Sequence, residues 1–140
     1  MDSLGLSDFI IFHGKKNLAE TKNKLAKSRA LLFPSVRDTS GNVVLEAMSK
    51  AVPVIGFNHQ GVKEMLTKDC GILIEPSNLE TSINDMADAI IKLNSNDQLS
   101  HEMGLAGRNR IRNHFIWPMK RDFMQSIYDT IIEKECQTKN

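Results

Sequence analysis

The residues best suited to chemistry lie in one stretch, from Pro34 to Met48. It reads P-S-V-R-D-T-S-G-N-V-V-L-E-A-M and contains two carboxylates, Asp38 and Glu46, with seven residues between them. Gly41 stands just before an apolar helical pattern, so the amides that follow it would be unpaired donors at the positive end of a helix. Such amides suit a phosphate, whereas carboxylates accept charge-assisted hydrogen bonds from hydroxyl groups. A phosphate site between two hydroxyl-binding carboxylates indicates a nucleotide sugar.

The stretch from Pro34 to Met48 lies among short apolar runs that alternate with helical patterns. This alternation predicts parallel βαβ units. Four short apolar runs predict strands at 9–13, 30–33, 52–57 and 71–74, and a glycine or proline stops all but the third of them. The helical patterns between them predict crossover helices at about 17–28, 42–50 and 61–67. We therefore predict an α/β fold, a Rossmann-like partial domain of about four parallel strands with flanking helices. In such a sheet, ligands bind at the carboxyl ends of the strands.

After the last predicted strand, the pattern is helical. Ser77 to Glu80 has the spacing of a capping box and predicts a helix start, and Pro118 suits the first turn of a later helix. These elements predict a C-terminal helical segment within one domain that covers 1–133, followed by a polar tail at 134–140.

Composition excludes several classes of protein. The 140 residues suffice for one domain, and 18 basic against 17 acidic side chains give no broad positive field, so nucleic acid is not an expected partner. Cys70 and Cys136 match no CxxC spacing, which favours reduced thiols and a cytoplasmic chain. The first residues have no signal-peptide pattern. The sequence contains no run of 18 apolar residues, so no transmembrane helix is predicted.

Other charged residues offer weaker signals. No His/Cys cluster or DxD motif occurs, so no metal is expected. A basic stretch contains Arg108, Arg110, Arg112, Lys120 and Arg121. A solvated helical face is the favoured interpretation of this stretch, and contact with anionic lipid or with a further domain is the alternative.

The stretch from Pro34 onward resembles the signature of GT-B-type retaining glycosyltransferases, the group 1 or family-four glycosyl transferases. That signature reads roughly P-S-x-x-E-G-F-G-L-V-x-L-E-A-M-A-x-G-x-P-V-I. The chain agrees with it at Pro34, Ser35, Asp38, Gly41, Val43, Leu45, Glu46, Ala47, Met48, Pro53, Val54 and Ile55. Flanking pieces at 6–14, 61–64 and 71–76 agree as well, so the resemblance covers residues 4 to 132.

The resemblance implies the C-terminal, donor-binding half of a hexosyltransferase in glycan or polysaccharide biosynthesis. It implies a UDP-sugar or GDP-sugar donor, retention of configuration, and no metal or other cofactor. Glu46 would bind the ribose hydroxyls and Asp38 would face the transferred sugar, and these two are the candidate catalytic residues. The implied donor-binding groups are the amides of Ser40, Gly41, Asn42 and Val43, which would hold the diphosphate, and the loop of Gly14, Lys15 and Lys16, which would border the base.

The chain departs from the family pattern in two ways. Asp38 replaces a glutamate, and Thr39 and Ser40 replace the usual Gly-Phe. Two earlier strands, whose Arg and Lys clamp the diphosphate, and an acceptor-binding N-terminal domain have no counterpart. In the family the two strands lie between 9–13 and 30–33, so we expect either direct pairing of those two strands or a homo-oligomer that lends strands.

Two alternative functions stay open. The isolated chain is expected to be a catalytically inert module that binds a nucleotide sugar, because the acceptor domain is missing. An unrelated doubly wound protein is disfavoured, because no GxGxxG fingerprint occurs. The implied location is cytoplasmic, with membrane contact at most peripheral, at the inner face.

Overall fold

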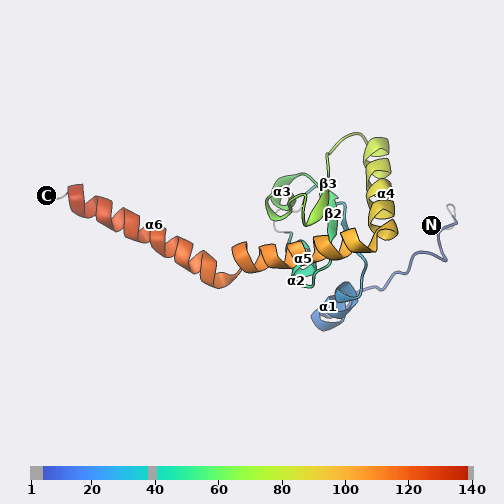
Figure 1. Ribbon diagram of the computed structural model, residues 1–140, viewed down its shortest axis with the longest axis horizontal. Helices are drawn as coiled ribbons and strands as arrows, with labels where there is room; N and C mark the ends of the chain where they lie inside the picture. The colour runs from blue at the N-terminus through green and yellow to red at the C-terminus, as the bar shows by residue number, and fades with distance from the viewer. Residues whose placement is uncertain (1–4, 38–40, 139–140) are drawn as a thin grey trace.

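A small parallel sheet organises the chain (Figure 1). The computed structural model describes residues 5–37 and 41–138, with side chains through Lys134. Within these residues the sheet has three strands in the order β1-β2-β3: β1 (Leu31–Phe33), β2 (Val54–Phe57) and β3 (Gly71–Ile74). Leu31 lies beside Val54 and Val54 beside Gly71, so all the carboxyl ends share one edge. The α/β class predicted from the apolar runs is confirmed.

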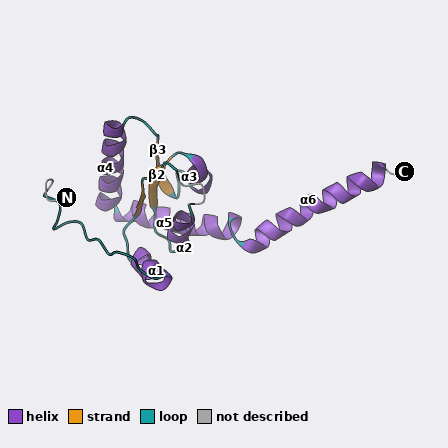
Figure 2. Cartoon of the chain, turned by 180° about the vertical axis from the view of Figure 1, so that it is seen from behind, coloured by secondary structure: helices purple, strands orange, loops and turns teal. Residues whose placement is uncertain are grey.

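Helices cover both faces of this sheet (Figure 2). The crossover helices α2 (Asn42–Ser49) and α3 (Gln60–Met65) pack on one face, and α4 (Leu79–Ser95) packs on the other against β2 and β3. A further helix, α5 (Asp97–His114), contacts α2, α4 and β3, and α1 (Leu18–Ala26) packs against α2.

Helix α6 (Trp117–Thr138) continues beyond α5 and projects away from the body of the molecule (Figure 1). Pro118 lies in its first turn, as its type predicts. No helix among the described residues is long and apolar enough to cross a membrane.

The side chains of β2 point alternately to the two faces of the sheet and contribute to two separate hydrophobic cores. Val54 faces α2 and α3 and is fully buried with Val44 and Met48, whereas Ile55 and Phe57 face α4. Side chains on a strand point alternately to opposite faces, and a strand buried on both sides must be apolar throughout. This explains why the continuous apolar runs correctly predicted β2 and β3.

The expected strand at 9–13 is wrong. These residues lie in an irregular segment before α1, and Phe9 is 82% exposed. An apolar run forms a strand only where a neighbouring strand accepts its backbone hydrogen bonds. No such neighbour exists among the described residues, so the sheet has three strands and not four. Completion of the sheet by another copy stays a prediction.

The missing fourth strand leaves β1 at the edge of the sheet. Leu31 and Phe33 pack towards α2, but Leu32 points to the α4 face and is 43% exposed. Helix α4 packs mainly against β2 and β3, and Leu32 lines an open groove between β1 and the Ile90 and Leu93 side of α4.

The start of α4 lies one residue later than the capping box predicts. Asn78, not Ser77, is the N-cap, and its Oδ1 accepts a hydrogen bond of 2.9 Å from the amide of Thr81. The amide of Ser77 instead donates to Ser82 Oγ at 3.4 Å. Asparagine caps a helix as well as serine does, so the pattern alone could not choose between two adjacent capping residues.

The assignment of the N-cap to Asn78 can be tested by mutation. We expect Asn78→Ala to lower the free energy of unfolding by about 1 kcal/mol, because the Thr81 amide loses its acceptor. Ser77→Ala is the matched control and should change it by less than about 0.5 kcal/mol. Urea denaturation followed by circular dichroism measures both, and the reverse ranking would place the cap at Ser77.

Candidate functional site

The turn that leads into α2 requires a glycine. Gly41 is buried and adopts the left-handed conformation, with φ of 50°. A β-carbon placed there would lie 3.1 Å from both Sδ and Cε of Met65. The carbonyl of Gly41 accepts the amide of Val44 at 2.7 Å and so begins the helix. Backbone conformation and close packing therefore both favour glycine here.

The amides of Asn42 and Val43 follow at the amino end of α2. Neither has a hydrogen-bond acceptor among the described residues, and the first turn contains no acidic side chain. Unpaired amides at the positive end of a helix attract an anion. This end of α2 is therefore suited to a phosphate group.

Glu46 lies one turn further along α2. It is half-buried, and its carboxylate forms no hydrogen bond or ion pair within the described part of the chain. The core residues Val44, Ala47 and Met48 occupy one face of the helix, whereas Glu46 shares the opposite face with Asn42. A carboxylate with free acceptor oxygens thus stands on the same face as the first free amide.

The loop at 14–16, the other described part of the predicted site, lies before α1 and forms no hydrogen bond or ion pair with α2 among the described residues. Gly14 (φ of 60°) and Lys15 lie in the exposed segment before α1, and Lys16 pairs with Glu20 at 3.8 Å. Asp38 and Ser40 lie outside the described residues, so their predicted roles stay predictions.

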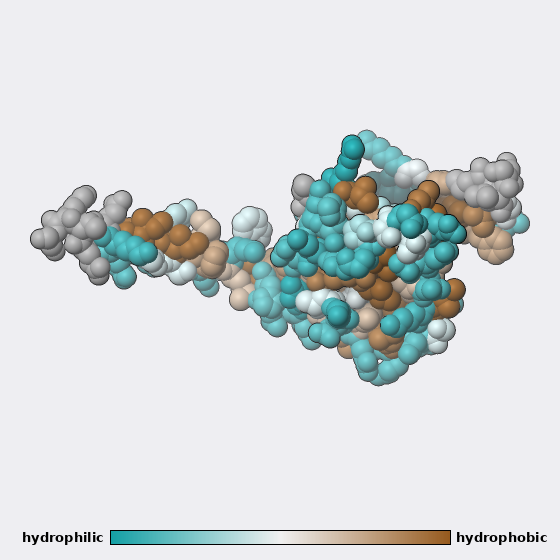
Figure 3. Space-filling view, turned by 90° about the horizontal axis from the view of Figure 1, so that it is seen from above, coloured by the Kyte–Doolittle hydropathy of each residue, from teal (hydrophilic) through white to brown (hydrophobic). Residues whose placement is uncertain are grey.

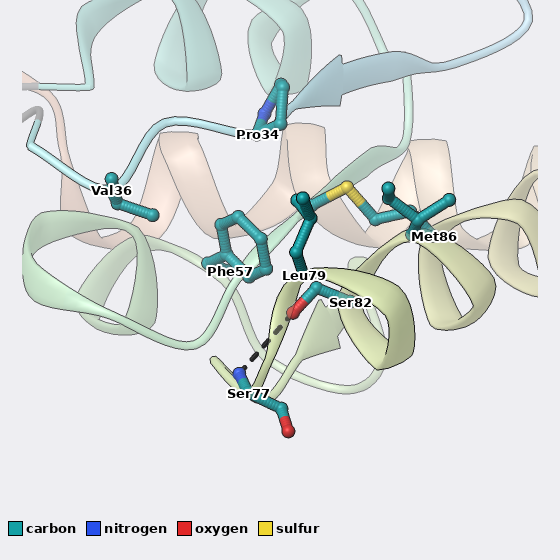
Figure 4. Close-up of a pocket in the computed structure, with 8 residues that line it drawn as sticks. Pro34, Val36, Phe57, Ser77, Leu79, Ser82 and Met86 are labelled. Carbon is teal, nitrogen blue, oxygen red and sulfur yellow. Dashed lines mark hydrogen bonds between the residues drawn. The ribbon is translucent and has the colours of Figure 1, made fainter.

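A separate cavity opens at the carboxyl edge of the sheet, on the α4 face (Figure 4). Its volume is about 400 Å³, and its lining includes Pro34, Val36, Phe57, Ser77, Leu79, Ser82, Ile83 and Met86. Figure 4 shows Phe57, Leu79 and Met86 directed towards one another, with the Ser77 to Ser82 hydrogen bond below them. A largely apolar lining suits an apolar or planar group and not a phosphate.

The sequence interpretation missed this cavity. It lies on the face of the sheet opposite α2, and neither Gly41 nor Glu46 lines it. The signal was present in α4, because Leu79 and Ile83 belong to its apolar stripe yet are largely exposed. Helical periodicity identifies an apolar stripe but not whether another element covers it.

The sequence that contains the amides of Asn42 and Val43 and the carboxylate of Glu46 matches a known protein family. The family model described as glycosyl transferases group 1 matches residues 1–110. The chain belongs to this family. The resemblance to the C-terminal half of GT-B-type enzymes is thereby confirmed for most of the chain.

Two curated relatives of this glycosyl transferase chain agree with the assignment. N-acetyl-alpha-D-glucosaminyl L-malate synthase of Bacillus anthracis is 32% identical over 131 residues, which are 92% of this chain and 32% of that protein. The capsular polysaccharide biosynthesis glycosyltransferase CapM of Staphylococcus aureus is 30% identical over 109 residues, 77% of this chain and 27% of CapM. The chain spans about a third of the length of these relatives.

A solved structure supports the fold of this glycosyl transferase chain. Sucrose-phosphate synthase of Thermosynechococcus elongatus superposes with a TM-score of 0.79 and 22% identity, covering 95% of this chain and 33% of that one. No group of three or more His, Cys, Asp or Glu side chains that could hold a metal ion occurs among the residues described.

Proposed function

We propose that this chain binds the nucleoside diphosphate of a sugar donor at the start of α2. It does so as the donor-binding part of a hexosyltransferase in glycan or polysaccharide biosynthesis. The observation that carries the proposal is that the amides of Asn42 and Val43 and the carboxylate of Glu46, all on one helix, have no partner among the residues that the structure describes. The polysaccharide role is supported by the name of the relative CapM.

The proposed mechanism assigns each group of α2 one task. The amides at the helix start donate hydrogen bonds to the diphosphate and stabilise the negative charge that develops on it as the bond between the sugar and the diphosphate breaks. Glu46 accepts hydrogen bonds from the ribose hydroxyls and fixes the register of the nucleotide. Gly41 supplies the left-handed turn that begins α2, and its lack of a side chain makes room for Met65 behind the turn.

Further parts of the proposal rest on the family resemblance. Asp38 is proposed to face the transferred sugar, Ser40 to add an amide to the diphosphate site, and the loop of Gly14, Lys15 and Lys16 to border a uracil or guanine base. Transfer is proposed to retain configuration without a metal. The acceptor is proposed to bind in an N-terminal domain, because the chain spans only about a third of its curated relatives.

A second candidate is a module that binds the donor without catalysing transfer. The same partial coverage of the relatives favours it for the 140-residue chain alone, since these residues match only about a third of that relative. Hydrolysis of a UDP-sugar or GDP-sugar by the chain, abolished in Glu46→Ala, would reject this candidate.

Calorimetric titration with UDP and with GDP tests the proposed site. We expect the chain to bind one of them and Glu46→Gln to bind it at least about 10-fold more weakly, because the neutral amide loses the charge-assisted hydrogen bonds worth about 1.5–3 kcal/mol. Glu80→Gln, an exposed position on α4, is the matched control and should bind as the parent does. Absence of binding by the parent chain, or equal affinity of Glu46→Gln, would contradict the proposal.

A further inference from the structure

A side chain of α5 binds the carboxyl end of α3. Arg110 Nε donates to the carbonyl of Met65 at 2.8 Å, and Arg110 Nη2 donates to the carbonyl of Glu64 at 3.0 Å. The last carbonyls of a helix have no partner within the helix, and the forked guanidinium can bind two of them at once. Arg110 therefore fixes the end of α3 against α5, which passes beside it (Figure 1).

An aromatic ring keeps this guanidinium in place. Phe115, the C-cap of α5, has its ring centre 5.6 Å from the Arg110 guanidinium, a distance at which the ring attracts the cation. Phe115 also packs against the core that contains Met65. Arg110 is half-buried and belongs to the body of the molecule, whereas the hydrophobic side chains of α6 gather on a helix that leaves the body (Figure 3).

Met65, whose carbonyl Arg110 binds, packs behind the turn that begins α2. It is buried, and its Sδ and Cε both lie 3.1 Å from the position that a β-carbon would take on Gly41. The Met65 side chain therefore lies directly against the bare backbone of this turn. Gly41 immediately precedes Asn42 and Val43, whose amides form the proposed diphosphate site. A shift of Met65 would therefore move the turn and the two amides with it.

We infer that Arg110 is a positioning residue for the diphosphate site, an inference that rests on the proposed function. Its guanidinium is engaged by two carbonyls, so it acts through them. It fixes the end of α3, the side chain of Met65 then supports the turn at Gly41, and this turn aims the amides of Asn42 and Val43. Donors that are already aligned bind an anion without the cost of ordering them, so loss of this support weakens binding.

Calorimetric titration of Arg110→Ala with UDP and with GDP tests this role. We expect the nucleotide that the parent chain binds to be bound at least about 5-fold more weakly, because the amides lose their alignment. The ratio of the two affinities should stay the same as salt is raised, since screening acts on long-range charge and not on alignment. A ratio that falls towards one with salt would assign the effect to charge and overturn the inference.

Arg29→Ala is the matched control. Arg29 Nη2 likewise donates to two carbonyls at a helix end, those of Leu93 at 2.6 Å and Asn94 at 3.4 Å on α4. Its loss removes the same kind of support from a helix on the other face of the sheet, and should change the affinity by less than about 2-fold. Equal affinities of Arg110→Ala and the parent, or equal losses in the two variants, would overturn the inference and leave the donor site itself standing.

Amide spectra without nucleotide test the same coupling independently of donor binding. In two-dimensional 1H–15N spectra, we expect the signals of Asn42 and Val43 to shift in Arg110→Ala and to stay in place in Arg29→Ala. Unchanged signals in Arg110→Ala would overturn the inference even if the parent binds no nucleotide, a result that would contradict the proposed function separately. The same spectra verify folding. Arg110→Lys replaces an alanine variant that does not fold, because an ammonium does not reproduce the fork on two carbonyls.

Discussion

Replacement of Gly104 by alanine is expected to destabilise the protein by about 3 kcal/mol, although alanine is the better helix former. Gly104 lies in the middle of α5, where a β-carbon would stand 2.0 Å from the carbonyl oxygen of Ala51. That oxygen belongs to the turn after α2, in which Ala51 adopts a positive φ of 59°. Because backbone atoms oppose the new methyl group, α5 must move away from α2 and open the core between them.

Gly107→Ala is the matched control for this change. Gly107 lies one turn further along α5, but its added β-carbon would be 3.5 Å from Met48 Cγ, an ordinary contact. We expect this variant to be as stable as the parent or more stable by up to about 1 kcal/mol. Urea denaturation compares the two, and equal stability of both variants would contradict the close approach of α5 to Ala51.

The second large effect is expected for Met48→Ala. Met48 is fully buried in the core that supports α2, where its Cγ lies against the bare backbone of Gly107. Removal of its side chain leaves a cavity that a helix backbone cannot fill, so we expect a loss of about 2–5 kcal/mol in the free energy of unfolding.

The same denaturation experiment measures this loss, with Met124→Ala as the control. Met124 lies on α6, the helix that projects from the body, and is 43% exposed. It should change stability by less than about 1 kcal/mol. A comparable loss in both variants would show that α6 shares the core that holds α2.

Much of the fold could be predicted from the sequence because its signals are local. The apolar run of β2 follows Pro53 and that of β3 ends just before Pro76, and the helices between the strands follow helical spacing. The run at 9–13 carries the same signal but has no neighbouring strand. Pairing depends on the rest of the sheet, which a local pattern does not contain.

The candidate site could likewise be predicted only where its residues are close together in the sequence. Gly41, Asn42, Val43 and Glu46 share one short helix, so spacing alone places them together. The position of the loop at 14–16 relative to that helix depends on tertiary packing. The cavity beside α4 was missed for a similar reason, since three segments distant in sequence form its wall.

The open edge of β1 has a practical consequence for the purified polypeptide. Its unpaired backbone groups offer a template for any extended apolar segment, and Phe9–Phe12 of a neighbouring molecule is such a segment. We therefore expect concentrated samples to exchange strands between molecules and to precipitate, and we expect a charged residue in place of Leu32 to reduce both effects.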